Sequence, residues 1–334
     1  MQDKVRWAIL GTARIATGKV IPAIQRGQSS QVVAIASRSL DKAKEIAKQF
    51  GIPKAYGSYE ELLSDVDIEA VYNPLPNHLH VPWSIRCAES GKHVLCEKPI
   101  ALSVNECKTL ISARNKAGVQ IGEAFAVRCH PQWLRVQELV RSGAIGQLRS
   151  IAATFGFTVN DREDIRNVPA FGGGAIMDIG CYPIHIARFL FAEEPESVSA
   201  LIDRDPQTRI DRLSSVILGF PSGHCVFSCG IQNVLNQSVQ ILGTVGRIDI
   251  SFPFVPHPYR NCQLRVDNGA DPWHGGVNVE EIARCDQYSL QADHFSRAIR
   301  GVGDVSTPLE DSIKNMTVLE AVFESARRGR AVHP

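Results

Sequence analysis

Short apolar runs rich in β-branched residues alternate with longer helical patterns over residues 4–122 of this chain. A strand, a helix and a second strand in succession form a parallel pair joined by a right-handed crossover. The helical segments 41–50, 81–90 and 104–118 end at glycines, which are common helix stops. The alternation predicts an α/β domain with a parallel sheet made from five runs: VRWAIL (5–10), VVAIAS (32–37), AVYNPL (70–75), HVLCEKP (93–99) and VQIGEAF (119–125).

The pattern changes from about residue 126, where strand-like runs follow one another with few helices between them. Segments 221–223 (PSG) and 244–246 (TVG) have the composition of turns between neighbouring antiparallel strands. This part predicts an α+β domain with a large, mostly antiparallel open sheet. Its expected strands are 148–157, 197–203, 214–220, 224–231, 238–244 and 246–251.

The change of pattern predicts two domains, residues 1–125 and residues 126–334. A helix over 131–142 and a glycine-rich segment over 171–191 belong to the second domain. The mainly helical end, about 289–329, can pack either on the second domain or back on the first. The length of 334 residues is ample for two cores of this size.

Composition excludes several classes of partner. The formal net charge is +1, which favours neither nucleic acid nor a membrane surface. No apolar run reaches the roughly 20 residues of a membrane span, and too few apolar residues separate Lys4 and Arg6 from Gly11 for a signal peptide. We therefore expect a cytoplasmic protein. Nine scattered cysteines without a C-x-x-C pair predict reduced thiols, and His78 and His80 lack a third ligand, so no metal is expected.

The first βα turn carries a partial dinucleotide-binding loop. Gly11, Ala13 and Ala16 stand at the three positions of G-x-G-x-x-G/A, and Thr12, Arg14 and Ile15 complete the loop. The first glycine permits the tight turn, and helix amides beyond it can bind a pyrophosphate. Alanine at the second position adds a methyl group where the phosphate approaches. An ordinary βα turn is the alternative interpretation.

The end of the second expected strand bears on which dinucleotide is bound. Ser37 and Arg38 stand there, and Lys42 follows, without the acidic residue that binds the ribose hydroxyls of NAD. Arg38 can face a 2′-phosphate. The sequence therefore predicts a preference for NADP(H), with NAD(H) also possible. In the alternative interpretation, Arg38 is a solvated surface charge.

Three further motifs join the loop at Gly11: NPLPNHLH (73–80), GKHVLCEKP (91–99) and GGGAIMDIGCY (172–182). In this order and spacing they resemble the Gfo/Idh/MocA family of oxidoreductases, and the likeness runs from about residue 4 to about residue 330. Together with EAFAVRCHPQ (123–132), the tyrosine form of the last motif is most similar to one branch of that family. That branch contains glucose–fructose oxidoreductase, NADP-dependent D-xylose dehydrogenase and dimeric dihydrodiol dehydrogenase.

The resemblance implies a Rossmann domain and a second domain whose open sheet joins subunits into a homodimer or homotetramer. It implies that Lys98 and Tyr182 are catalytic, and that the Lys98–Pro99 peptide is cis. Many relatives have histidine in place of Tyr182 and an acid in place of His185, so a mechanism with histidine as base does not transfer. The cofactor contacts that the resemblance implies are Leu75, Pro76, Asn77, His80, Glu97, Lys98 and Arg128.

The residues themselves suggest how Lys98 and Tyr182 would act. Lys98 stands at the carboxyl end of a parallel strand, where open α/β sheets place ligands. Tyr182 follows Asp178 by four residues, so both are expected on one helical turn. A free tyrosine with a pKa near ~10 is a poor base at neutral pH, and the charge of Lys98 would stabilise its phenolate. Asp178 would orient Lys98 or a substrate hydroxyl.

Other polar residues are candidates for the same site. Each has an alternative structural role: Tyr182 in a packed core, Asp178 at a helix start, and the others at the surface or in internal hydrogen bonds. The glycine run 172–174 would let the backbone pass close to a ligand. The expected substrate contacts are Lys98, Arg128, Asn160, Arg166, Asp178, Tyr182 and His185, with Asp161 and His130 nearby and Tyr288 covering the nicotinamide end.

These features favour an NADP-dependent oxidoreductase that acts on a CH–OH or C=O group of a sugar or polyol, as an aldose 1-dehydrogenase does. A trans-dihydrodiol dehydrogenase, or a reductase of dicarbonyls or anhydrosugars, is the alternative within the enzymes. A non-catalytic NADP-binding sensor is the alternative outside them. Lys98 and Tyr182 favour the enzyme, because a sensor would not need them.

Overall fold

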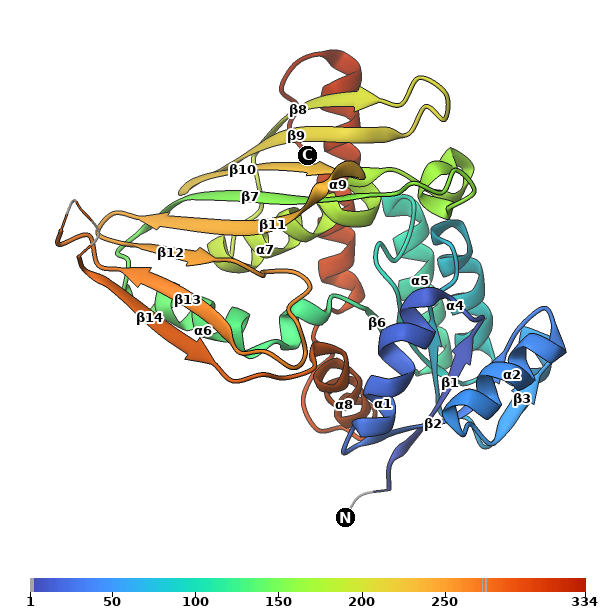
Figure 1. Cartoon of the computed structure of the whole chain (residues 1–334). Coiled ribbons are helices and arrows are strands. Elements are labelled where there is room, and N and C mark those ends of the chain that lie inside the picture. Colours follow the sequence, from blue (N-terminus) through green and yellow to red (C-terminus); the bar gives the residue numbers. More distant parts are fainter. Residues whose placement is uncertain (1–2, 272, 274) are drawn as a thin grey trace. The chain divides into compact units, whose positions relative to one another are not determined.

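A computed structural model of the chain describes residues 3–271, 273 and 275–334. These residues form two compact units. The first contains the chain up to Cys129 together with Asp286–Ile313, and the second contains His130–Cys285 and Lys314–Pro334. Each unit is built around one sheet (Figure 1).

The first unit has a six-stranded parallel sheet in the order β3-β2-β1-β4-β5-β6. Strand order reverses between β1 and β4, and open α/β sheets bind ligands at the carboxyl ends of the strands beside such a reversal. The predicted Rossmann-type sheet is confirmed. The strands are β1 (Val5–Leu10), β2 (Ser30–Ala36), β3 (Lys54–Tyr56), β4 (Ala70–Asn73), β5 (His93–Cys96) and β6 (Ile121–Glu123).

The helices of the first unit begin and end where local chemistry predicts. Ser39, Ser58 and Ser103 cap helix starts with their side chains, and Gly51 and Gly118 end helices with positive φ angles. These helices are a π-helical turn η1 (Ala16–Val20), α1 (Ile21–Arg26), α2 (Leu40–Phe50), α3 (Tyr59–Leu63), η2 (Asn77–Leu79), α4 (His80–Glu89), α5 (Val104–Ala117), η3 (Ala126–Cys129) and α8 (Gln287–Ile299).

The second unit has an eight-stranded sheet in the order β14-β13-β12-β11-β7-β10-β9-β8. All its ladders are antiparallel except β7 with β10, which is parallel. The predicted mostly antiparallel sheet is confirmed, as are the turns at 221–223 and 244–246. Its strands are β7 (Leu148–Thr158), β8 (Ser197–Arg204), β9 (Asp211–Phe220), β10 (Gly223–Gly230), β11 (Gln232–Gly243), β12 (Arg247–Ile250), β13 (Cys262–Asp267) and β14 (Val277–Ile282).

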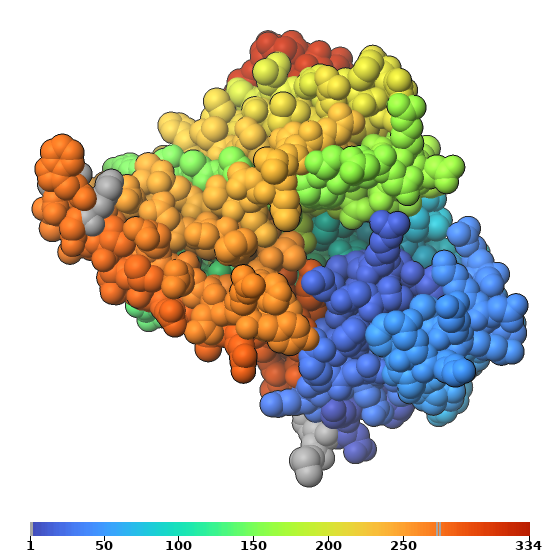
Figure 2. Space-filling view, viewed as in Figure 1, coloured from blue at the N-terminus to red at the C-terminus, as the bar shows by residue number. Residues whose placement is uncertain are grey.

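Helices α6 (Pro131–Arg141) and α7 (Cys181–Phe191) lie against one face of this sheet (Figure 1). A π-helical turn, η6 (Ile176–Gly180), precedes α7, and the short η4 (Ile165–Asn167) and η5 (Pro169–Phe171) precede that turn. The last helix, α9 (Leu309–Arg328), begins in the first unit and continues into the second. The opposite face of the sheet, in yellow to orange, forms the surface toward the viewer in Figure 2.

Among the described residues, no helix combines the length and the apolar character that spanning a bilayer requires.

Candidate active site

Gly11 stands directly after β1 with a φ of +78°, which favours glycine. Its N–H donates to the Ala36 carbonyl at 2.8 Å, so the turn is fixed to the next strand. A Cβ at Gly11 would lie 3.2 Å from Leu75 Cδ2 and 3.3 Å from the Tyr59 hydroxyl oxygen. The structure therefore brings Leu75, one of the expected cofactor contacts, to the glycine loop.

Ala13 directly precedes the helical residues that follow Gly11, and its carbonyl accepts the Thr17 N–H at 3.1 Å. Thr12 and Ala13 are half-buried and Arg14 is exposed, whereas Ile15 packs against the core of the sheet. A glycine turn that leads into a helix N-terminus, with an apolar residue beneath it, fits the pyrophosphate of a dinucleotide.

The end of β2 offers polar and basic groups to an adenosine. Ser37 is buried, and its hydroxyl accepts the Ser39 N–H at 3.3 Å. Arg38 and Lys42 are exposed, and no acidic residue lies between Ala36 and Leu40. This charge pattern fits a 2′-phosphate better than ribose hydroxyls.

Tyr59 is a functional candidate that the sequence did not reveal. It is buried at the start of α3, with its hydroxyl beside Gly11 and its ring edge-on to Trp83 at 4.7 Å. Burial raises the pKa of Tyr59, and the positive charge of Arg38 opposes that rise. Only the fold joins these positions, because α3 was not expected from the sequence.

Lys98 follows β5, and hydrogen bonds of Glu97 fix the backbone beside it. The Lys98–Pro99 peptide is cis, as the resemblance implied. Glu97 accepts the Tyr72 hydroxyl at 2.6 Å with Oε1 and the Lys98 backbone N–H at 3.2 Å with Oε2. Burial and the negative charge of Glu97 raise the pKa of Tyr72 well above its ordinary value, so Tyr72 stays a proton donor. The sequence missed Tyr72, because a tyrosine inside a buried strand resembles ordinary core.

Tyr288 belongs to the same cluster. Its backbone N–H donates to Asp286 Oδ1 at 3.0 Å at the start of α8. Burial and the charge of Glu97 raise the pKa of Tyr288 to about 12, whereas the charge of Lys98 lowers it. Tyr288 is therefore neutral at physiological pH. Tyr72, Glu97, Lys98 and Tyr288 form one group in the first unit.

The remaining expected cofactor contacts of the first unit lie after β4 and β6. Pro76 and Asn77 are half-buried at η2, and Arg128 is half-buried in η3, where its N–H donates to the Phe125 carbonyl at 3.0 Å. His80 is buried, and its Nδ1 and Nε2 lie 2.7 Å from the Pro99 oxygen and 2.6 Å from the Leu75 oxygen.

In the second unit the structure brings Arg166 and Asp178 together. Arg166 Nε donates to Asp178 Oδ2 at 2.6 Å, and Arg166 Nη1 lies 3.1 Å from Asp164 Oδ1. The charge of Asp178 raises the pKa of Arg166 above its usual range, with Asp164 acting in the same direction. Asp178 thus carries its charge beside a guanidinium, and the pair presents both donors and acceptors, as recognition of hydroxyl groups requires.

The glycine run before Asp178 is packed against the chain itself. A Cβ at Gly173 would lie 2.5 Å from the Arg166 carbonyl oxygen. Gly174 has a φ of +111°, and a Cβ there would lie 1.9 Å from Asp211 Oδ1. Arg166 and Asp211 are thus close neighbours of these two glycines, and the close approach of a ligand to the glycine run stays a prediction.

Asp211 holds the start of the helix that carries Asp178 and Tyr182. Its Oδ2 accepts the Ile176 N–H at 2.6 Å. Burial raises the pKa of Asp211 to about 6, and the hydrogen bond from Ile176 opposes that rise. The sequence showed nothing to connect Asp211 with the glycine run 35 or more residues earlier.

Tyr182 is half-buried in α7, with its ring centroid 5.8 Å from that of Phe155 and 5.6 Å from that of Phe254. Asp178 lies in the π-helical turn before α7, which is wider than the α-helical turn expected for the two residues. His185 is buried one turn beyond Tyr182, whereas Asn160 and Asp161 are exposed after β7. His130 is buried at the start of α6, where its Nδ1 accepts the Gln132 N–H at 3.1 Å.

In the part of the chain that the structure describes, no three side chains of His, Cys, Asp or Glu gather as a metal ion would require. Nine cysteines are free thiols.

The chain matches known protein families over both of its units. Residues 5–125 match the model described as "Oxidoreductase family, NAD-binding Rossmann fold", and residues 133–249 match the "GFO/IDH/MocA C-terminal domain". An uncharacterized oxidoreductase from Rhizobium meliloti is 48% identical over 98% of both chains. The chain belongs to the Gfo/Idh/MocA family of oxidoreductases.

Two further relatives of known type match over nearly the whole chain. D-xylose 1-dehydrogenase (NADP(+)) 2 of Haloferax volcanii is 36% identical over 98% of both chains. The crystal structure of aldose–aldose oxidoreductase from Caulobacter crescentus, complexed with glycerol, is 30% identical. It superimposes with a TM-score of 0.89 over 99% of this chain and all of that one. The chain is thus an oxidoreductase with an NAD-binding Rossmann fold, and these two relatives are named for reactions of aldoses.

Proposed function

We propose that this oxidoreductase uses NADP(H) to interconvert a CH–OH and a C=O group of a sugar or polyol, as an aldose 1-dehydrogenase does. One observation carries the proposal. Lys98 stands at the carboxyl end of β5, where open α/β sheets bind ligands, and its backbone N–H donates to the half-buried Glu97, which also accepts the hydroxyl of the buried Tyr72. The sugar class is supported by the xylose dehydrogenase relative, which matches over the whole length.

In this proposal the chain's residues divide the chemistry between them. Bound NADP(H) would supply or accept the hydride. Lys98 would polarise the substrate oxygen, and Tyr182 would exchange a proton with that oxygen. The Arg166–Asp178 pair would orient neighbouring hydroxyl groups. The first unit would bind the cofactor, and the second would recognise the sugar.

The test is the formation of NADPH, followed by its absorbance, when the protein receives NADP with D-xylose, D-glucose, other aldoses or a cyclic trans-diol. Turnover on an aldose supports the proposal and ranks its substrates. Turnover on the diol alone would replace it with a dihydrodiol dehydrogenase. NADPH binding without turnover on any of these compounds would contradict it and favour a sensor.

Arg38→Ala is expected to lower the preference for NADP over NAD, measured as the ratio of kcat/KM values, by about 10- to 100-fold. A charge-assisted hydrogen bond to a phosphate contributes about 1.5–3 kcal/mol, which corresponds to that range. The exposed Arg141, at the end of α6, provides a matched control as Arg141→Ala. An unchanged ratio in Arg38→Ala would show that Arg38 is only a surface charge.

We also propose that two copies of the chain meet through the open face of the second sheet. Ile217 and Val226 face each other across β9 and β10 on that face, and both are about half exposed. Leu201, on β8, is 77% exposed on the same face. Exposed apolar patches of this kind mark interaction surfaces.

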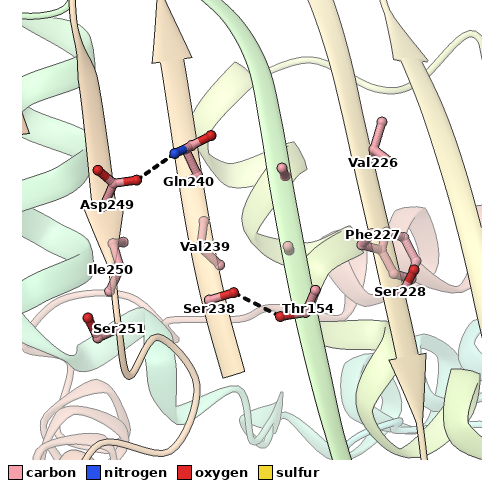
Figure 3. Close-up of a pocket in the computed structure, with 12 residues that line it drawn as sticks. Thr154, Val226, Phe227, Ser228, Ser238, Val239, Gln240, Asp249, Ile250 and Ser251 are labelled. Carbon is pink, nitrogen blue, oxygen red and sulfur yellow. Dashed lines mark hydrogen bonds between the residues drawn. The ribbon is translucent and has the colours of Figure 1, made fainter. Parts of the chain in front are cut away.

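The middle of this face is shallow and carries small side chains (Figure 3). It forms an open hollow of about 460 Å³, in which the Thr154 and Ser238 hydroxyls are 2.8 Å apart and Gln240 Nε2 donates to Asp249 at 2.7 Å. The polar groups are thus bonded to each other across the strands. Such a surface can be covered by another sheet without leaving those groups unsatisfied.

The double variant Leu201→Asp/Ile217→Asp is expected to convert an oligomer into a monomer of 36.6 kDa in size-exclusion chromatography with light scattering. Burying two carboxylates in an apolar interface costs far more than the interface gains there. Val66→Asp, at an 87% exposed position of the first unit, is the control and should keep the wild-type mass. A wild-type protein that is already monomeric, or a double variant that stays oligomeric, would exclude this interface.

A further inference from the structure

His80 is placed to connect two loops that meet at the carboxyl ends of the strands. It is the first residue of α4 and only 1% exposed. Its Nδ1 lies 2.7 Å from the carbonyl oxygen of Pro99, and its Nε2 lies 2.6 Å from that of Leu75. One imidazole ring therefore contacts the backbone of both loops.

Each of these loops carries part of the site. Pro99 directly follows Lys98 in the chain. A bond to the Pro99 carbonyl therefore restrains the backbone from which the Lys98 side chain projects. The Leu75 side chain lies against the glycine loop, 3.2 Å from where a Gly11 Cβ would stand. We propose that His80 is a positioning residue, which holds the Lys98 segment in register with the loop that borders the dinucleotide site.

The backbone around His80 is itself held in place. Asn73 Nδ2 donates to the His80 carbonyl at 3.0 Å and to Ser84 Oγ at 3.1 Å, so the ring projects from a fixed point. On the far side of Pro99, the Ile100 N–H donates to Glu123 Oε1 at 2.9 Å. His80 supplies the link between these two anchored regions.

The protonation of the ring decides how the link is made. A carbonyl oxygen only accepts, so both bonds form at once only when both ring nitrogens carry protons. Burial lowers the pKa of His80 to about 4, and the charges of Lys98 and His78 act in the same direction, whereas the bonds to Pro99 and Leu75 oppose them. At neutral pH the ring donates to one carbonyl and packs between both loops.

This inference rests on the proposed function only through Lys98, so its test includes a measurement that needs no turnover. In His80→Phe the ring volume remains, but the hydrogen bond that the neutral ring donates is lost, and with it the polar connection between the two loops. Amide hydrogen exchange is expected to accelerate about tenfold in peptides that cover residues 74–79 and 97–101, since both loops contact that ring. Cys87→Ala, a buried change on the same helix, is the control and should leave both peptides unchanged.

The second measurement is catalysis by the folded variants. A displacement of about 1 Å can cost on the order of 100-fold, so kcat of His80→Phe should fall by about that factor with a smaller change in KM. His80→Gln retains a donor and should recover part of the rate. In the Lys98→Met background, His80→Phe should cost less than about a further twofold, because the two changes act through one group.

Three results would overturn the inference. Unchanged exchange at 97–101 in His80→Phe would show that the ring does not hold the lysine segment. Faster exchange with unchanged kcat would show that this link does not position Lys98 for the reaction. A full 100-fold loss that persists in the Lys98→Met background would assign His80 a role independent of the lysine. If no substrate is turned over at all, the proposed function fails, and exchange alone still decides whether His80 ties the loops.

Discussion

Lys98→Met is expected to lower kcat for NADP-dependent aldose oxidation by about 1000-fold, which is within the range lost when a proton-transfer or charge-stabilising group is removed. Methionine keeps the length and apolar stem of the side chain but not its charge. The positive charge is the part that would polarise the substrate oxygen. Stopped-flow or steady-state measurement of NADPH absorbance gives the loss of rate. The variant should still bind NADPH, because the substitution leaves the glycine loop and Arg38 unchanged.

The control for this prediction is Lys48→Met, at an exposed position near the end of α2. It removes the same charge at a residue outside the proposed site and should retain the wild-type rate. The hydrogen bonds around Lys98 indicate that the Lys98→Met variant can be checked for normal folding. The Glu97 carboxylate accepts the Tyr72 hydroxyl and the Lys98 backbone N–H, and neither bond involves the Lys98 side chain, so the variant should fold normally. Near-wild-type turnover by folded Lys98→Met would refute the proposed mechanism.

Tyr182→Phe is expected to lower kcat by about 100- to 10,000-fold, the usual contribution of general acid–base catalysis. The substitution removes one oxygen and keeps the ring that packs against Phe155 and Phe254. Its effect on stability should therefore be small, and thermal unfolding should be close to that of the wild type. The rate loss should appear in kcat more than in the KM for the sugar, because the proton moves only in the transition state.

Tyr259→Phe is the matched control, since Tyr259 is 65% exposed and lies in the loop before β13. It should leave both kcat and KM unchanged. If Tyr182→Phe kept its rate while Lys98→Met lost it, Lys98 would have to serve as both charge and proton donor. If both variants kept their rates, the enzyme would use other residues, and the sequence motif would mark only the fold.

Much of the first unit could be predicted because its signals are local. The strand β1, Gly11 and the helix after it lie within a few residues of each other, and the stops at Gly51 and Gly118 are set by backbone conformation. Strand β3 and helix α3 were missed. The strand has three half-buried residues and no apolar alternation, and its place at the sheet edge depends on pairing with β2.

In the second unit, too, the elements with local sequence signals could be predicted and those that depend on long-range pairing could not. Turn residues at 221–223 and 244–246 predict hairpins, since such turns act between adjacent strands. The parallel pairing of β7 with β10 joins segments about 70 residues apart, which no turn encodes. Strands β13 and β14 were also missed, because their outward positions carry charges such as Arg265 and Glu281 and their pairing appears only in the folded sheet.

The sequence by itself determined the parts of this protein that depend on neighbours along the chain. These are the alternating strands and helices, the glycine loop, the lysine at a strand end and the family motifs that contain Lys98 and Tyr182. Only the tertiary structure decided which side chains support them: Tyr59 beside Gly11, Tyr72 on Glu97, Asp211 at Gly174, and His80 between Leu75 and Pro99. The physical reason is that a buried hydrogen bond or close contact is made between surfaces that the fold brings together, and sequence distance does not encode that proximity.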